Sequence, residues 1–270
     1  MKIRGWMMKK PDFLHYKQQA LLTINLAKND FNQKYAASSL GIVWGFLPSI
    51  MTILIYWMVF TFAFRSGNTK EPFLLWLMSG MIPWLFFSDA IVGATNSYVE
   101  YSYLVKKVVF NIHLLPIVKI VSAAFTHVFF LVIMFFTLLG YGYLPSASYL
   151  FLLYYSLCLI LFAFALGQIL ATLNVLFRDV SNLVMIILQF SIWLLPILWQ
   201  PDILPETAVT ILRFNPMFYI IEGYRKSFLP TTGSMTSVWY TAYFWIALLV
   251  LILAGNYLFK KLNNQFADLL

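Results

Sequence analysis

The chain has 270 residues, of which 61% are hydrophobic, 19% are aromatic and only 10% are charged, and its formal net charge is +8. Soluble domains carry about 25% charged residues, so this composition excludes a soluble globular protein and predicts an integral membrane protein. The single cysteine, Cys158, excludes an intrachain disulfide and is expected to be a small buried packing residue.

The N-terminal region precedes the long apolar runs. Its first ten residues are basic but no apolar core follows them, so we expect no signal peptide. Residues 13–32 are predicted to form an amphipathic helix on the membrane surface, because apolar residues recur there at helical spacing and Leu40 soon begins the first apolar run. A helix that packs on a partner outside the membrane is the alternative. The apolar face comprises Phe13, Ala20, Ile24, Ala27 and Phe31.

Six later runs are apolar and long enough to cross a bilayer, which takes about 20 residues. Because lipid offers no hydrogen-bond partner to a bare backbone, each run is predicted to be a helix. The predicted fold is therefore an all-α membrane protein with one domain, residues 1–270. The six predicted spans are 39–64, 73–95, 115–139, 148–176, 182–199 and 237–259.

Lysine and arginine are divided unevenly between the two sides of these spans. If the N-terminus is inside the cell, thirteen of the 18 basic residues lie on the inner side and five on the outer side. The positive-inside rule then predicts that both termini and the loop 97–113 are cytoplasmic. The net charge requires no nucleic-acid partner, because a basic cytoplasmic face suits anionic lipid.

The segment 200–236 is predicted to lie outside the cell. It contains two apolar, helix-compatible stretches, 208–214 and 217–228, which an Asn-Pro dipeptide separates. We expect the pair to dip back into the outer leaflet as short re-entrant helices, and an ordinary external loop is the alternative. Glu222 and Arg225 are three residues apart on the second helix and are expected to pair with each other.

Few polar features fall inside the apolar runs. Asp89 is costly in hydrocarbon, so it is expected to face protein or a water-filled route. His127 is expected to be a buried imidazole that hydrogen-bonds a neighbour. Gly41-x-x-x-Gly45 permits close helix approach and is consistent with first spans that pack at a dimer seam.

The loop 97–113 is a short polar segment between long apolar runs. It holds Glu100, Lys106, Lys107 and His113 within fourteen residues. A membrane protein that draws its energy from a separate motor needs a contact surface outside the lipid. We therefore expect this loop to contain a cytoplasmic helix that docks onto such a motor, and a merely solvated connection is the alternative.

Short motifs follow one another in a distinctive order along nearly the whole chain. They are Gly41-Ile-Val-Trp-Gly-Phe-Leu-Pro48, Tyr56-Trp-Met-Val-Phe60, Gly80-Met-Ile-Pro-Trp84, Asn96-Ser-Tyr98, Phe177-Arg-Asp-Val180 and Phe214-Asn-Pro216. With the N-terminal helix, they resemble the transmembrane subunit of ABC transporters that export lipid-linked polysaccharides, the wall teichoic acid and O-antigen exporters. The resemblance is closest to the teichoic acid branch.

This resemblance implies a homodimer that pairs with two ABC ATPase subunits, which close against cytoplasmic coupling helices when ATP binds. No glycine in the chain is followed by lysine, so it has no phosphate-binding loop, and ATP and Mg²⁺ are expected in the partner. We expect no cofactor, catalytic residue or metal site in this chain. The alternative role for Asp179 is to cap the helix that begins near Val180. The residues expected to dock the ATPase are Tyr98, Glu100, Tyr101, Leu104, Val105, Arg178 and Asp179.

The resemblance also implies a substrate, a lipid-pyrophosphate-linked teichoic acid or related polysaccharide that moves from the cytoplasmic to the outer side of a bacterial plasma membrane. Two lysines and a histidine near the cytoplasmic mouth are expected to attract the pyrophosphate, with membrane anchoring as their alternative role. Some aromatic rings of the first two spans are expected to stack on sugars, whereas most are expected to face lipid, the membrane interface or the core. The residues expected along the path are Lys106, Lys107, His113, Asp89, Trp57, Phe60 and Trp84.

Two other function classes fit the residues less well. An ion-coupled secondary transporter of a lipid or glycolipid normally needs several carboxylates or a relay inside the membrane, and we find one aspartate and one histidine. A membrane glycosyl- or phosphotransferase needs clustered carboxylates or a His-Arg constellation, whereas the ten acidic residues are scattered singly.

Overall fold

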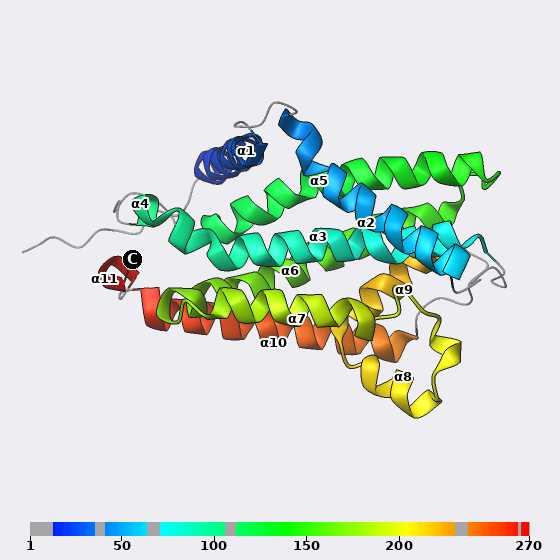
Figure 1. The fold of residues 1–270 in the computed structure, drawn as a ribbon. Coiled ribbons are helices and arrows are strands. Elements are labelled where there is room, and N and C mark those ends of the chain that lie inside the picture. Colours follow the sequence, from blue (N-terminus) through cyan, green and yellow to red (C-terminus); the bar gives the residue numbers. More distant parts are fainter. Residues whose placement is uncertain are drawn as a thin grey trace, which may run out of the picture.

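Helices make up the whole described architecture. The computed structural model describes residues 13–35, 41–63, 71–105, 112–229, 237–263 and 266–269. Within these ranges the elements are α-helices, short 3₁₀ turns and one π-helical stretch, with no strand among them (Figure 1). The prediction of an all-α chain is confirmed for this part of the protein.

Four helices are long and apolar enough to cross a membrane. The shortest has 25 residues and measures about 38 Å at 1.5 Å per residue, which exceeds the hydrocarbon thickness of about 30 Å. They match the predicted spans 73–95, 115–139, 148–176 and 237–259. The four helices are α3 (Phe73–Glu100), α5 (Leu114–Gly140), α6 (Leu150–Leu176), which follows the 3₁₀ turn η3 (Ala147–Tyr149), and α10 (Val238–Leu262).

The first predicted span, 39–64, is not one continuous α-helix. It contains the 3₁₀ turn η1 (Gly41–Gly45), then α2 (Leu47–Met58), then the π-helical stretch η2 (Val59–Ala63). Gly41 has a left-handed φ of 54°. Because residues 41–45 are not α-helical, the two glycines do not share a helix face, and the interpretation of Gly41-x-x-x-Gly45 as a helix-packing surface is wrong.

The fifth predicted span, 182–199, is also shorter in the structure, where α7 runs from Val180 to Leu194. The helix ends there because Pro196 disfavours helical backbone at the residue before it, and Leu195 is extended with φ −84° and ψ 150°. Asp179 occupies the N-cap position of α7, but its side chain makes no capping hydrogen bond. The capping role considered for Asp179 is therefore wrong.

The central element of the bundle is α3. Helices α5 and α6 pack along it, and α7 and α9 (Pro216–Phe228) also contact it. In its most apolar 18-residue stretch 78% of the residues are buried, against 22–39% in the other three long helices. Gly167 of α6 makes the close approach to α3 possible, since a Cβ atom at this position would lie 2.8 Å from the Cβ of Ala94. Helices α5, α6, α7 and α9 are therefore positioned against α3, whereas α10 packs on α6.

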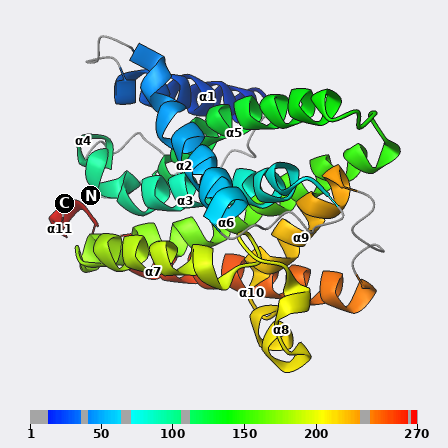
Figure 2. The same cartoon turned by 45° about the vertical axis from the view of Figure 1, so that its right-hand side comes forward.

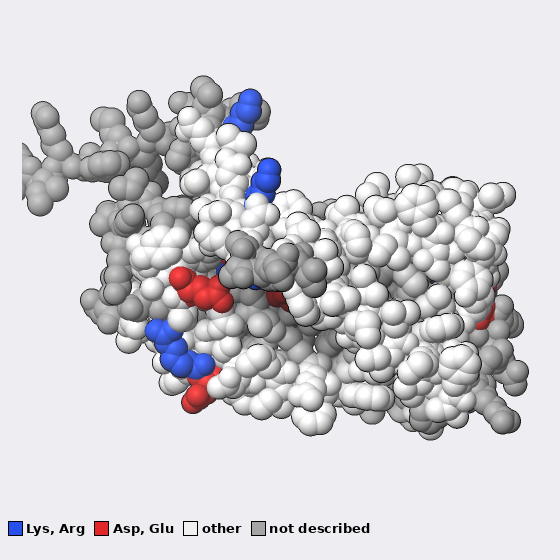
Figure 3. Space-filling view, turned by 45° about the horizontal axis from the view of Figure 1, so that its top comes forward, with Lys and Arg blue, Asp and Glu red and all other residues white. Residues whose placement is uncertain are grey.

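The bundle has two different ends (Figures 1 and 2). The short helices α4 (Ser102–Val105) and α11 (Phe266–Leu269) lie at one end, and α8 (Glu206–Leu212) and α9 lie at the other. Outside the bundle, α1 (Phe13–Tyr35) packs on α5 near the end that carries α4. On the face shown in Figure 3, charged side chains gather toward the end that carries α1 and α4, and a wide uncharged area extends from there toward the other end. Such an area suits contact with lipid.

The buried face of α1 differs from the predicted apolar face. Ala27 and Phe31 are buried as expected, but Ile24 is exposed. Thr23 and Asp30 are buried instead. The predicted apolar residues are thus divided: Ala27 and Phe31 meet the bundle, whereas Ala20 and Ile24 lie on the exposed side, where they remain available to a membrane surface.

The predicted helical pair 208–214 and 217–228 is present as α8 and α9. Asn215 caps α9, since its Oδ1 accepts a hydrogen bond of 2.9 Å from the backbone N–H of Met217. Nearly every residue of α9 is buried, against α6 and α3 above all. Helix α9 is thus a core element of the bundle, whereas α8 is largely exposed and only its Val209 is buried.

Arg225 of α9 does not pair with Glu222. Its side chain points into the bundle and is 3% exposed. The guanidinium Cζ lies 3.5 Å from the centre of the Trp76 ring, and Nη2 donates a hydrogen bond of 2.8 Å to the carbonyl oxygen of Pro196. The expected pair is wrong because α9 turns Arg225 toward α3, whereas Glu222 lies on a less buried side.

Candidate functional site

A cavity of about 890 Å³ lies between α2, α3, α5 and α7. Its volume falls within the range of about 300–1,000 Å³ that is usual for ligand sites. Trp193 of α7 meets Tyr56 of α2 edge to face with 6.3 Å between the ring centres, so these two rings join neighbouring walls. The aromatic lining residues are Trp44, Tyr56, Trp84, Phe86, Phe130 and Trp193.

Polar side chains are spread among these rings. They come from all four helices, so the cavity offers hydrogen-bonding groups on several sides together with flat aromatic surfaces. A ligand with many hydroxyl groups and apolar faces would find both kinds of partner here. The polar lining residues are Ser49, Ser88, Asp89, Thr126, His127 and Gln189.

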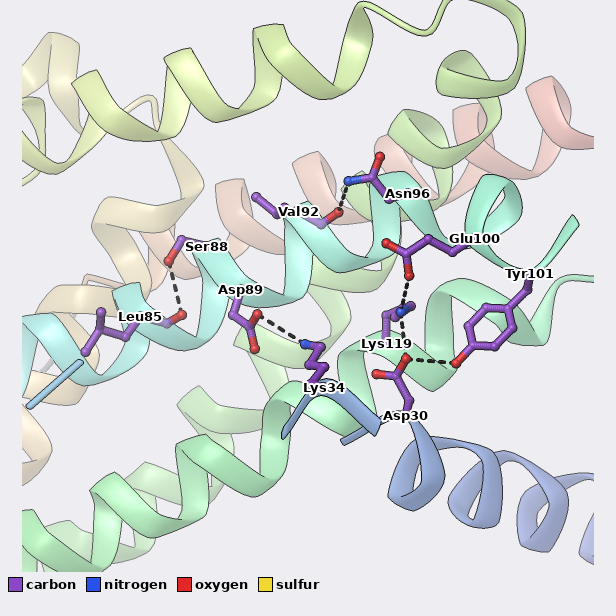
Figure 4. Close-up of polar contacts among 10 residues, drawn as sticks. All are labelled: Asp30, Lys34, Leu85, Ser88, Asp89, Val92, Asn96, Glu100, Tyr101 and Lys119. Atoms are coloured by element: carbon purple, nitrogen blue, oxygen red, sulfur yellow. Dashed lines mark hydrogen bonds and ion pairs between the residues drawn. The ribbon is translucent and has the colours of Figure 1, made fainter. Parts of the chain in front are cut away.

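Asp89 lines this cavity and is the only acidic residue among the described lining residues. Its side chain is 47% exposed, and Lys34 of α1 places its Nζ 3.4 Å from Oδ1 (Figure 4). The carboxylate therefore faces the cavity and a lysine of α1 rather than the interior of the bundle. This position agrees with the expectation for Asp89, and Lys34 was not anticipated.

A second cluster of charges lies one helical turn earlier on α1. Lys119 of α5 places its Nζ 2.6 Å from Oδ1 of Asp30, and the same Nζ also donates to Oε2 of Glu100 at the end of α3. The hydroxyl of Tyr101 donates a hydrogen bond of 2.8 Å to Asp30 (Figure 4). One lysine thus joins the surface helix α1, the span α5 and the end of α3.

The electrostatics of this cluster follow from burial and pairing. Burial alone would raise the pKa of Asp30, but the Lys119 ammonium and the hydroxyls of Ser122 and Tyr101 together hold this pKa below its ordinary value. Burial and the bond to Asp30 raise the pKa of Tyr101. Asp30 is therefore ionised and Tyr101 neutral near pH 7, which is the state in which both contacts form.

Two of the residues expected to dock an ATPase, Glu100 and Tyr101, belong to this cluster. Tyr98 is fully buried in its own chain, where its ring centre lies 5.2 Å from that of Phe266 and 6.0 Å from that of Phe259. Tyr98 thus packs inside the protein and stabilises this end of α3. Tyr103, which the sequence analysis passed over, is exposed in α4.

The remaining docking candidates are separate from this cluster. Leu104 and Val105 belong to α4, but the structure does not describe their side chains. Arg178 and Asp179 are exposed in the turn between α6 and α7. Among the described residues, no ion pair or hydrogen bond joins these two to Glu100, so their docking role stays a prediction.

The residues expected along a substrate path are also divided. Trp84 lines the cavity together with Asp89. Trp57 and Phe60 pack on the core instead, and the Phe60 ring stacks on Phe73 with 5.6 Å between centres. Lys106 and Lys107 lie outside the described residues.

His113 precedes α5 at the end of the bundle that carries α4. Its Nδ1 lies 3.1 Å from the amide nitrogen of Gln168, and its ring centre is 3.6 Å from that of Phe259. Burial, with the charge of Lys260, holds the pKa of His113 below its ordinary value of 6.5. A neutral, half-buried imidazole in this place contacts its own chain.

His127 confirms the expectation of a buried, hydrogen-bonded imidazole. Its Nε2 lies 3.0 Å from the hydroxyl of Tyr224, which in turn lies 2.6 Å from the hydroxyl of Ser156. Within the described ranges, no group of three His, Cys, Asp or Glu side chains lies close enough together to hold a metal ion.

The sequence analysis missed Asp30, Lys34 and Lys119 as site residues. Lys34 and Lys119 were counted only as basic residues of the inner side. One signal was present: Asp30 and Lys34 carry opposite charges four residues apart, so they lie on one face of a helix. Lys119 gave no comparable signal, because its partners are 89 and 19 residues away in the chain.

Comparisons with known proteins agree with this architecture. The family model described as ABC-2 type transporter matches residues 22–229. Similar proteins include an O-antigen export system permease protein RfbA of Klebsiella pneumoniae, 24% identical over 250 residues, which cover 92% of this chain and 95% of that protein. Another RfbA, of Myxococcus xanthus, is 26% identical over 259 residues, which cover 94% of this chain and 96% of that protein.

Proposed function

The chain belongs to the ABC-2 type transporter family, and from this premise we propose that it is the membrane subunit of an ATP-driven exporter of a lipid-linked polysaccharide. The names of the similar O-antigen export permeases support a polysaccharide as the substrate. We propose a lipid-pyrophosphate-linked teichoic acid or a related anionic polymer. The direction proposed is from the cytoplasmic to the outer side of a bacterial plasma membrane.

The observation that carries this proposal is the lining of the large cavity. Its rings offer flat faces on which sugars stack, and its serine, threonine and glutamine side chains offer hydrogen bonds to sugar hydroxyls. The path proposed for the polymer runs along this cavity, past Trp84 and Asp89. Lys106 and Lys107 are proposed to attract the pyrophosphate by their charge where the polymer enters, and His113, which is neutral, is proposed to contribute a hydrogen bond rather than charge.

Energy for transport is proposed to come from two ABC ATPase subunits that bind a homodimer of this chain, with ATP and Mg²⁺ held by the ATPases. The proposed docking surface is the end of α3 with α4, where Tyr103 is exposed, the Glu100 side chain is half exposed and Tyr101 is partly buried. Arg178 and Asp179 of the turn between α6 and α7, with Leu104 and Val105 of α4, are proposed to complete this surface.

The proposed membrane topology has six crossings. The four long helices supply four of them, and α2 with its π-helical extension and α7 supply the other two. Residues 47–63 measure about 25 Å, close to the hydrocarbon thickness. Both termini and α4 are then cytoplasmic, α1 lies on the inner membrane surface, and α8 with α9 forms the re-entrant pair on the outer side.

Transport by the purified complex tests the function. The chain is co-expressed with its ATPase, isolated and reconstituted in proteoliposomes, and ATP-dependent movement of the lipid-linked polymer is measured. Loss of one stacking ring removes about 0.5–1.5 kcal/mol, so Trp193→Ala should lower transport about two- to tenfold. Trp239→Ala, which removes an exposed tryptophan of α10 outside the cavity, is the matched control and should transport normally.

Two results would reject the proposal. The first is transport by this chain alone, driven by a proton gradient, with no ATPase bound, which would favour an ion-coupled transporter. The second is equal transport by the Trp193→Ala and Trp239→Ala variants and the unsubstituted protein, which would exclude the cavity as the path.

A further inference from the structure

All three ion pairs between described side chains meet where α1 lies against the bundle. Asp30 and Lys34 of α1 are four residues apart, so both point from one face of this helix. They bind different helices, since Asp30 contacts Lys119 of α5 and Lys34 contacts Asp89 of α3 (Figure 4). Two ion pairs therefore hold α1 against the bundle: in one, α1 supplies the carboxylate, and in the other, it supplies the ammonium group.

The two carboxylates that share Lys119 are not equivalent. The side chains of Asp30 and Lys119 are each 5% exposed, whereas that of Glu100 is 50% exposed. A buried ion must keep a partner, but a half-exposed carboxylate can exchange its partner for water at little cost. Asp30 is therefore the permanent partner of Lys119, and Glu100 is the exchangeable one.

Glu100 occupies a particular place in the fold. It is the last residue of α3, and Tyr101 and α4 follow it directly. These residues form the docking surface proposed above, and Tyr101 also holds Asp30 through its hydroxyl. Any displacement of this segment therefore pulls on α1 at two points, once through Lys119 and once through Tyr101.

The other contact of α1 lies at the cavity. One turn beyond Asp30, Lys34 meets Asp89, which lines the cavity wall. Along α3, Asp89 and Glu100 are eleven residues apart, about 16 Å. Since α1 touches both places, its movement at one of them changes the contact at the other.

We infer that Lys119 is a positioning residue that makes α1 follow the docking segment, so that ATPase movement at Glu100 and Tyr101 makes or breaks the Lys34–Asp89 pair at the cavity. The four-carbon side chain of Lys119 is flexible enough to keep both Asp30 and Glu100 as the docking segment moves, and release of Glu100 to water ends the link. When the Lys34–Asp89 pair breaks, both side chains become available to the polar substrate. This inference rests on the proposed function and specifies its regulation.

The first test measures the movement of α1 directly, with all the residues of the ion pairs unchanged. Spin labels are placed at the exposed positions Leu21 of α1 and Val128 of α5, in a Cys158→Ala background, and distances are measured in the intact complex in lipid nanodiscs. The distance between the labels should change when a non-hydrolysable ATP analogue is added. An unchanged distance in a complex that transports would overturn the inference.

The second test changes Lys119 and measures polymer exported per ATP hydrolysed. Lys119→Met removes the shared cation and should lower this ratio about tenfold or more, since charged hydrogen bonds are lost from the link. Lys119→Arg keeps a cation with several donors and should retain most coupling. Equal ratios in a folded Lys119→Met complex and the unsubstituted complex would refute the inference.

Exchanging the charges of Asp30 and Lys119 distinguishes a role of Lys119 in coupling ATP hydrolysis to export from a role in anchoring α1. Asp30→Lys with Lys119→Asp rebuilds the pair between α1 and α5 but sets two carboxylates against each other at Glu100. This double variant should stay uncoupled, and addition of Glu100→Lys should restore coupling. Full coupling in the double variant would mean that Lys119 only anchors α1. If no ATPase binds the unsubstituted chain, the proposed function fails; if ATP-driven export occurs while α1 stays still, only this inference fails.

Discussion

Arg225 offers a quantitative test of how α9 is held against α3. Its guanidinium is almost fully buried, stacks on Trp76 and donates to the carbonyl oxygen of Pro196. The substitution Arg225→Met keeps an unbranched apolar stem of similar length and removes the charge and its donors. The change therefore isolates the polar contacts of this residue from the packing of its stem.

The expected loss is the sum of opposing contributions. A hydrogen bond from a charged donor contributes about 1.5–3 kcal/mol, and a cation over a desolvated aromatic ring contributes about 2 kcal/mol. Relief from burying the charge offsets part of this. We expect Arg225→Met to lower the free energy of unfolding by about 2–4 kcal/mol.

A double-mutant cycle with Trp76→Leu measures the stacking contribution alone. Unfolding of the purified protein in mixed micelles is followed at increasing SDS for both single variants and the double variant. The coupling energy should be about 2 kcal/mol. Trp239→Leu, which changes an exposed tryptophan, is the control and should be additive with Arg225→Met. Additivity between Arg225 and Trp76 would contradict the proposed role of the stack.

Three further predictions concern stability, measured as thermal unfolding of the purified protein. Gly167→Ala should lower the free energy of unfolding by about 1–3 kcal/mol, because the added methyl meets Ala94, and Ala94→Gly should partly restore it. Asn174→Ala should lower it by about 1–3 kcal/mol, since its amide joins α3 to the start of α7, and an unchanged midpoint would contradict this. His113 has a lowered pKa, and its Nδ1 accepts a hydrogen bond from Gln168, so the neutral imidazole stabilises the fold. This contribution to the free energy of unfolding is complete above pH 6.5 and is lost as the pH falls, so His113→Gln should make the stability less sensitive to acid.

Hydropathy was sufficient to find the long helices, because a run that must satisfy its backbone in lipid has one available structure. The predicted span 115–139 differs from α5 by one residue at each end. The errors lie where the backbone conformation, rather than the hydropathy of the side chains, decides the type of helix or the residue at which it ends. The run 39–64 changes its helix type twice, and α7 stops before Pro196 although apolar residues continue to Trp199.

The candidate site was less predictable, because its contacts join residues far apart in the chain. Asp89 was predicted as a site residue because a charge within an apolar span is costly, and Trp84 because an aromatic ring there can stack on a sugar. Arg225 shows the limit of local reasoning: a spacing of three made a pair with Glu222 available, but burial against α3 gave its guanidinium other partners. Which face of a helix meets the bundle is decided by packing that a single sequence does not state.

One regularity nevertheless connects the acidic residues of α3 with α1. Eleven residues are three turns and a small remainder, so Asp89 and Glu100 lie on nearly the same face of α3. That face presents two carboxylates, and α1 adds a third, Asp30, but supplies only one nearby cation, Lys34. A second cation is therefore needed at the buried end, and only a neighbouring helix can bring it there. Lys119 meets this need from α5, which explains why a charged residue is retained within an apolar span.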